Sequence, residues 1–167
     1  MNIVVINPNT TAAMTARIGT TAKAVAQPGT HIIAIQPSAG PASIEGYADE
    51  AIAVPHMLEA LYSAQANNPD VAGYVIACFD DTGLDAARCV LDAPVVGIGE
   101  AACHMASLLA ARLSKEHGVP VIDGMDAAIK LIESLAALGL KTSKCTTYAK
   151  PLVKSYAGTV PNFITQK

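Results

Sequence analysis

The stretch at residues 74–83, YVIACFDDTG, decides the fold, because a short apolar run leads directly into a cysteine, two aspartates and a Thr-Gly turn. An apolar run of this length bounded by turn residues is typical of a fully buried strand. In a parallel sheet, functional groups collect in the loops beyond the carboxyl ends of the strands. The sequence therefore predicts that Cys78 lies at such an end, with a helix beginning at about Leu84.

Apolar runs and helical patterns alternate along the rest of the chain. Strands are expected at residues 3–6, 31–35, 71–77, 94–98 and 119–122. Helices are expected from a cap at Thr10 or Thr11 as far as Val25, and at residues 47–66, 84–90, 100–113 and 125–138. Pro55 is expected to kink the second of these helices or to divide it in two. This alternation predicts an α/β protein with a parallel sheet, followed by an irregular tail at 141–167.

One part of the chain echoes another. Residues 94–102, PVVGIGEAA, resemble residues 120–128, PVIDGMDAA, with a proline, two β-branched residues, a tight turn and an acidic residue at the start of a helix. Two pseudo-symmetric halves would explain the echo, and so would the ordinary likeness of any two strand–helix units.

Length and composition exclude several classes of protein. The chain has 167 residues, of which 51% are hydrophobic and 15% charged, which indicates one globular domain rather than a disordered chain. A net charge of −3 and the absence of Trp argue against a nucleic-acid partner. No apolar run approaches the roughly 20 residues of a membrane span, and no export signal is present. We therefore expect a cytoplasmic protein with four free thiols and no membrane partner.

Short motifs point to no cofactor and no metal. Residues 97–99, GIG, lack the third glycine of a dinucleotide-binding fingerprint. Residues 81–83, DTG, spell the aspartic-protease triplet, but that chemistry needs two carboxylates from paired β-lobes. Leu84 occupies the position at which a cysteine phosphatase needs an arginine to hold phosphate. The four histidines form no metal-binding pattern.

Cys78 is the candidate reactive group. A cysteine reacts as its thiolate, and a free thiol with a pKa of about 8.5 is mostly protonated at neutral pH. The amino end of the following helix would lower that pKa, whereas Asp80 and Asp81 would raise it unless one of them caps the helix. The alternative is a buried structural cysteine, the class to which Cys89 and Cys103 are assigned.

Several short motifs occur in order along the chain: INPNT at 6–10, GPASIE at 40–45, YVIACFDD at 74–81 with GL at 83–84, PVVGI at 94–98 with EAA at 100–102, GVPVIDG at 118–124 and TSK at 142–144. Taken in this order, they resemble the Asp/Glu/hydantoin racemase family, specifically its hydantoin and allantoin racemase branch. Each motif alone has low specificity for the family, but the ordered set covers nearly the whole chain and is specific.

The resemblance implies a three-layer α/β/α fold with a parallel sheet, built as two pseudo-symmetric lobes around the active site. It implies cofactor-free racemisation, in which one cysteine thiolate removes a proton beside a carbonyl and a second cysteine returns one to the opposite face. Cys78 matches the first cysteine, and Asn7, Ser43, Phe79 and Asp80 match loop positions that line the family's substrate cleft. The expected substrate is a 5-substituted hydantoin or a related ureide such as allantoin, and a homo-oligomer is expected.

The chain departs from the family pattern near residues 114–115. The Gly-Cys-Ala-Gly-type word that carries the second cysteine is absent, and residues 109–114 run directly into 115–120. We expect a first lobe at 1–98, a remnant of the second at 99–117, and a segment at 118–167 that returns to the first. Either the protein contains further residues at this join, or a deletion has removed them. A deletion would expose an apolar patch on the helix at 100–113, which favours further residues.

Two other functions stay open. One is an amino-acid racemase of the Asp/Glu branch, although Phe79 follows the cysteine where those enzymes more often have a small polar residue. The other is a catalytically inactive module for small-molecule binding or dimerisation.

Overall fold

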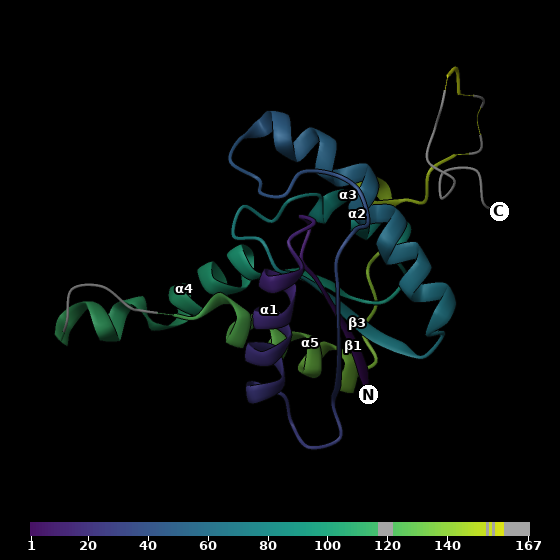
Figure 1. The fold of residues 1–167 in the computed structure, drawn as a ribbon. Helices are drawn as coiled ribbons and strands as arrows, with labels where there is room; N and C mark the ends of the chain where they lie inside the picture. The colour runs from purple at the N-terminus through teal and green to yellow at the C-terminus, as the bar shows by residue number, and fades with distance from the viewer. Residues whose placement is uncertain (117–121, 153, 155, 159–167) are drawn as a thin grey trace.

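Within the residues that the structure describes, the fold is a parallel four-stranded sheet with helices on both faces (Figure 1). The computed structural model describes residues 1–116, 122–152, 154 and 156–158, with the backbone alone at 109–116. The strands are β1 (Asn2–Ile6), β2 (His31–Ile35), β3 (Val71–Ile76) and β4 (Val95–Gly97). The helices are α1 (Ala12–Val25), α2 (Tyr47–Asn67), α3 (Leu84–Val90), α4 (Ile98–Glu116) and α5 (Gly124–Ala137), followed by the 3₁₀ helix η1 (Thr146–Tyr148).

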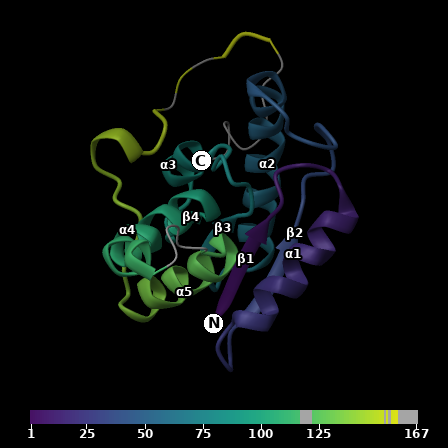
Figure 2. The ribbon, with the colours of Figure 1, turned by 90° about the vertical axis from the view of Figure 1, so that its left-hand side faces the viewer.

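The strand order is β2-β1-β3-β4, and every pair is parallel. Side chains alternate between the two faces of a strand, so Ile3 and Val5 of β1 join one core while Val4 and Ile6 join the other. The first core contains residues of α1, α4 and α5, and the second contains residues of α2 and α3. In Figure 2, α1 and α5 lie in front of the sheet and α2 lies behind it. The predicted three-layer α/β/α architecture is therefore confirmed.

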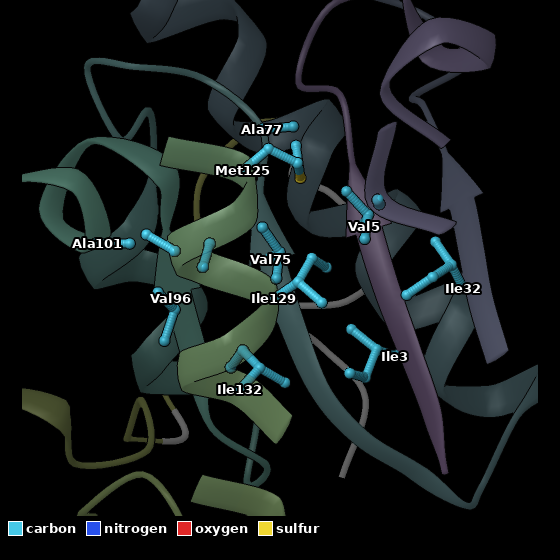
Figure 3. Packing of buried hydrophobic residues seen from close by; sticks show 13 residues of the cluster. Ile3, Val5, Ile32, Val75, Ala77, Val96, Ala101, Met125, Ile129 and Ile132 are labelled. Carbon is cyan, nitrogen blue, oxygen red and sulfur yellow. The ribbon is translucent and has the colours of Figure 1, made fainter. Parts of the chain in front are cut away.

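Helix α5 anchors the carboxyl-terminal part of the chain to the sheet. Ile129 and Ile132 are fully buried against Ile3 and Val75 (Figure 3). Each isoleucine contributes about 1.5–3 kcal/mol by this burial. A Cβ on Gly73 would lie 2.5 Å from Cγ2 of Ile132, so β3 needs a glycine where the helix crosses it.

Two details of the elements differ from the sequence prediction. α2 is one continuous helix that includes Pro55, so of the two predicted alternatives, a kink or a division, the structure excludes the division. The carbonyl that Pro55 leaves without a helical partner belongs to Ala51, which is exposed, so water can satisfy it. α4 begins at Ile98, which the sequence analysis placed in the preceding strand.

Part of the predicted pattern lies outside the described residues. This holds for all of the predicted strand at 119–122 except Ile122, and for the start of the echo at 120–128. Residues 124–128 of the echo form the start of α5, which has Asp126 in its first turn as α4 has Glu100. Across the described ranges, no helix combines the length and apolar character needed to cross a bilayer.

Candidate active site

Cys78 lies two residues beyond the carboxyl end of β3, as the sequence predicted. Backbone hydrogen bonds tie this end of the sheet together: Ala77 N–H donates to the Ile6 carbonyl at 2.8 Å, and Asn7 N–H donates to the Ile35 carbonyl at 2.9 Å. The loops that follow β1, β2 and β3 therefore start from one edge of the sheet, which is where functional groups gather in parallel α/β folds.

The thiol of Cys78 forms a compact cluster with Asp80 and Thr82. Its S–H donates to Oδ1 of Asp80, with 2.8 Å between sulfur and oxygen. The same carboxylate oxygen accepts the hydroxyl of Thr82 at 2.6 Å and the backbone N–H of Thr82 at 3.2 Å. Thr82 Oγ1 also lies 3.4 Å from the sulfur of Cys78. Three groups within five consecutive residues thus share one hydrogen-bond network.

The cluster holds the proton on sulfur. Burial raises the pKa of the Cys78 thiol, and the hydrogen bond to Asp80 and the Asp80 charge raise it further, against an opposing contribution from Thr82. Burial also acts to raise the pKa of Asp80, but hydrogen bonds from Cys78 and Thr82 outweigh it, so this pKa is below its ordinary value. These shifts favour a thiol at Cys78 beside a carboxylate at Asp80, the form in which Cys78 can act as an acid.

Asp81 docks the cysteine loop onto the start of α4. Its carboxylate accepts the backbone N–H groups of Gly99 at 2.9 Å and Glu100 at 2.7 Å, which are donors without helical partners. Burial raises the pKa of Asp81 despite these two bonds. The sequence analysis considered an aspartate cap on the helix that begins at Leu84. The structure contradicts this. The N-cap residue of α3 is Gly83, no side chain caps that helix, and Asp81 caps α4 instead.

The glycines of the GIG motif make this docking possible. A Cβ on Gly97 would lie 1.9 Å from Oδ1 of Asp81, and a Cβ on Gly99 would lie 2.2 Å from the Phe79 carbonyl oxygen. Asp81 itself has a φ of 56°, a left-handed conformation that Asp tolerates better than most residues. The motif therefore serves close packing of two loops, which accounts for its two glycines without a nucleotide.

Asn7 is buried, with 1% of its surface exposed, and its side chain organises the loop between β1 and α1. Its Nδ2 donates to Oδ1 of Asn9 at 2.8 Å and to the Thr15 hydroxyl at 3.1 Å, while its Oδ1 accepts the Asn9 backbone N–H at 3.3 Å. Substrate binding by Asn7 stays a prediction, and the contacts show that this side chain also supports its own loop.

Ser43 and Phe79 are exposed side chains on two different loops. The loop of Ser43 is tethered to the start of α1, because the Thr11 hydroxyl donates to the Ala42 carbonyl at 2.6 Å. The Ser43 hydroxyl donates to Oε1 of Glu45 at 3.0 Å. Phe79 has 68% of its surface exposed, directly after Cys78. The structure thus joins the loops of Asn7 and Ser43, and it places Phe79 and Asp80 beside the thiol.

The other three cysteines lie outside the Cys78 cluster. All four are free thiols. Cys89 is half-buried and its S–H donates to the Thr147 carbonyl at 3.5 Å. Cys103 and Cys145 are exposed, so the assignment of Cys103 to the buried structural class was wrong. The helix buries Ala101 and Ala102 and leaves the next position in solvent.

Sequence reasoning missed Thr82, although a signal was present. Its side chain is completely buried and bonds to both Cys78 and Asp80. The signal is the triplet Asp-Thr-Gly at 81–83, which resembles a protease motif and places a hydroxyl next to the cysteine loop. In a turn that ends at Gly83, the chain can fold back so that a hydroxyl four residues after a cysteine contacts its sulfur.

For the described residues, no set of three or more His, Cys, Asp or Glu side chains is arranged to hold a metal ion.

The chain is similar to known racemases. Residues 3–114 match the family model for Asp/Glu/hydantoin racemase. The hydantoin racemase of Paenarthrobacter aurescens is 35% identical over 236 residues, which covers 93% of this chain and 100% of the relative. The hydantoin racemase of Pseudomonas sp. strain NS671 is 34% identical over 243 residues, with 98% and 97% covered.

Solved structures of allantoin racemases have the same fold. The enzyme from Klebsiella pneumoniae matches with a TM-score of 0.84 and 35% identity, covering 98% of both chains. The enzyme from Pseudomonas fluorescens matches with a TM-score of 0.82 and 26% identity, covering 95% of this chain and 100% of the other.

The alignments are longer than the chain. The alignment with the P. aurescens enzyme spans 236 positions against 167 residues here, so at least 69 positions, 236 less 167, have no counterpart in this chain. The match to the family model ends at Ser114.

Proposed function

This chain belongs to the Asp/Glu/hydantoin racemase family, and we propose that it is a cofactor-independent racemase of 5-substituted hydantoins or related ureides such as allantoin. Two hydantoin racemases at 34–35% identity and the allantoin racemase structures support this substrate class. The observation that carries the proposal is the Cys78 thiol at the carboxyl edge of the sheet, hydrogen-bonded to Asp80 and followed by an exposed Phe79.

The chemistry needs a base and an acid at one carbon. The C5–H of a hydantoin lies beside a carbonyl, so its removal produces a planar, enolate-like intermediate. Cys78 takes this proton as a thiolate, or returns one as a thiol, in the general acid–base role of a group within reach of the reacting carbon. Phe79 offers an apolar wall for the ring. Asn7, Ser43 and Asp80 are the polar groups that we assign to the substrate.

Inversion also requires a second acid–base group on the opposite face. We infer that this group belongs to a block that relatives carry near residues 114–115. The end of the family match at Ser114 supports this location, and the 69 or more unmatched positions support a block that this chain lacks. α4, whose last turn contains residues 114–115, runs outward from the sheet (Figure 1). Residues 1–98 then form the first lobe, 99–117 a remnant of the second, and 118–167 the returning segment.

We further propose that the protein is cytoplasmic and homo-oligomeric, with a small molecule rather than a nucleic acid or a membrane as its partner. The four free thiols agree with a reducing compartment. Sedimentation measurements on the purified protein would give its number of subunits.

The decisive experiment follows a single-enantiomer 5-substituted hydantoin in D₂O by optical rotation and by mass. Loss of rotation together with deuterium uptake supports two-base racemisation. Deuterium uptake without loss of rotation indicates one surviving base. If intact, folded protein gives neither signal, the racemase is excluded and a binding or dimerisation module is favoured. L-Aspartate and L-glutamate, assayed in parallel, test the amino-acid racemase alternative.

Two controls accompany this assay. Cys78→Ala should abolish both signals, and retained activity in that variant would refute the assignment. Cys145→Ala changes an exposed thiol in the tail and should leave both signals intact. Intact mass spectrometry of the same sample establishes whether the join is a deletion, since a mass near 17.1 kDa requires a chain without further residues.

A further inference from the structure

We propose that the Thr82 hydroxyl is a positioning group for Cys78, donating to Asp80 while the cysteine is a thiol and turning to the sulfur when the thiol gives its proton to the substrate carbon. Deepening the proposed function, this inference rests on the acid–base role of Cys78. Thr82 is not among the catalytic or substrate-binding residues named above.

The geometry gives the hydroxyl two acceptors. Thr82 Oγ1 lies 2.6 Å from Oδ1 of Asp80 and 3.4 Å from Sγ of Cys78, both within hydrogen-bonding range for their atom types. A hydroxyl carries one proton, so it donates to one of them at a time. Rotation of that single proton is enough to change the partner, and no heavy atom has to move.

Burial makes the exchange specific. Thr82 has 0% of its surface exposed, so the hydroxyl is shielded from competing solvent. Its backbone N–H donates to the same Asp80 oxygen at 3.2 Å and holds the residue in place. The hydrogen bonds from this hydroxyl to Asp80 and Cys78 are partly buried, and a partly buried hydrogen bond is electrostatically stronger than one in water.

Ionisation of Cys78 creates the need for this exchange. As a thiol, Cys78 donates its proton to Asp80 across 2.8 Å. Once that proton is gone, a thiolate faces a carboxylate at the same short separation, and the two charges repel. Asp80 is the charged group that acts on the thiol, and it opposes ionisation.

Two donors oppose that repulsion. The Asp80 backbone N–H favours the thiolate, but the backbone holds it in one direction. The Thr82 hydroxyl also favours the thiolate, and among the described contacts of Cys78 it is the donor that can redirect. The hydroxyl therefore lets Cys78 alternate between acid and base without rearranging its loop.

The test measures the ionisation of Cys78 directly. In a parent protein with Cys89, Cys103 and Cys145 replaced by Ser, the rate of iodoacetamide alkylation is followed against pH by intact mass. Thr82→Val keeps the shape of the side chain and removes the hydroxyl. It should move the midpoint of the rate profile about one to two pH units higher, the range expected for one hydrogen bond to a charged group.

Matched variants separate the hydroxyl from the fold. Thr82→Ser keeps the hydroxyl and should retain the midpoint of the parent. Thr82→Ala lacks the hydroxyl and needs no extra space, so it gives the same information if the valine variant does not fold. An unchanged midpoint in the folded valine or alanine variant would overturn the proposal, as would an equal shift in the serine variant.

The readout is independent of racemase activity, because alkylation needs no substrate. If the parent catalyses neither deuterium exchange nor racemisation while Thr82→Val still shifts the midpoint, the proposed function fails and the assignment of Thr82 to the thiol stands. If the parent is active, Thr82→Val should lower the exchange rate at neutral pH about tenfold with an unchanged KM, and the rate should recover as the pH is raised.

Discussion

Asp81 and Glu100 join the cysteine loop to helix α4, through a hydrogen bond of 2.7 Å from the Glu100 backbone N–H to the Asp81 carboxylate. Asp81 lies in the loop after β3, and Glu100 lies in the first turn of α4, which directly follows β4. The Glu100 side chain in turn forms an ion pair with Arg88 of α3, the helix that follows the cysteine loop. The position of Cys78 is thus coupled to the start of the helix that leads toward the join at 114–115.

Gly97→Ala tests this coupling. The new methyl group would lie 1.9 Å from Oδ1 of Asp81, so either the carboxylate or β4 must move. We expect a loss of about 1–3 kcal/mol in the free energy of unfolding, as for other overpacked sites. Urea denaturation followed by circular dichroism measures it.

Gly46→Ala is the matched control for that variant. Gly46 has extended backbone with a φ of −175° and nothing within 4 Å of an added Cβ, so its substitution creates no clash and should cost less than about 1 kcal/mol, because alanine is a poorer N-cap than glycine. Equal losses in the two variants would show that docking of Asp81 is not the cause.

Asp80→Asn should make Cys78 easier to ionise. The Asp80 carboxylate raises the pKa of the buried thiol by accepting its proton and by its charge, so removing that charge lowers the pKa. We expect the alkylation midpoint to move down by about one pH unit in the triple-serine parent. Asp85→Asn, at an exposed position that bonds to the Tyr148 hydroxyl, is the control and should leave the midpoint in place. An upward shift in Asp80→Asn would contradict the assignment.

Glu133→Gln should reduce the dependence of stability on acid. Burial acts to raise the pKa of this carboxyl, but hydrogen bonds from the Gln27 N–H, the Thr30 hydroxyl and Lys130 outweigh it and leave the pKa below its ordinary value. A group with a lower pKa in the folded state contributes stability above its unfolded pKa of about 4.3, and loses it as the pH falls through the folded value.

The measurement is the urea midpoint of unfolding between about pH 5 and pH 3. The parent should lose stability across this window, and Glu133→Gln should be less stable at pH 6 with a flatter profile. Glu59→Gln, at an exposed position on α2, should follow the parent. Parallel profiles for the parent and Glu133→Gln would rule out a stabilising carboxylate at this position.

Much of the fold follows from local patterns. β2 and α3 have the bounds predicted from apolar runs and turn residues, and Cys78 lies at the strand end where the sequence placed it. Burial of alternate or helically spaced apolar residues is a local property, so it can be seen within a few residues of sequence. The ordered set of short motifs then indicated the racemase family and, with it, the three-layer architecture.

The docking of the cysteine loop depends on contacts between distant segments. Asp81 binds backbone groups 18 and 19 residues further on, and this contact explains Gly97, Gly99 and the early start of α4. Nothing in the residue types selects this partner over the start of α3. The order of β3 and β4 in the sheet does, because it places the two loops side by side.

The sequence by itself determined most of the helices and strands, the family and the position of the reactive cysteine, because each is encoded in short apolar runs or in an ordered set of motifs. Tertiary structure alone decided which aspartate acts on the thiol and which one docks the loop, and it buried the Thr82 hydroxyl between Cys78 and Asp80. The physical reason is that the pKa and the hydrogen bonds of a side chain depend on what surrounds it in space, which residue order does not state.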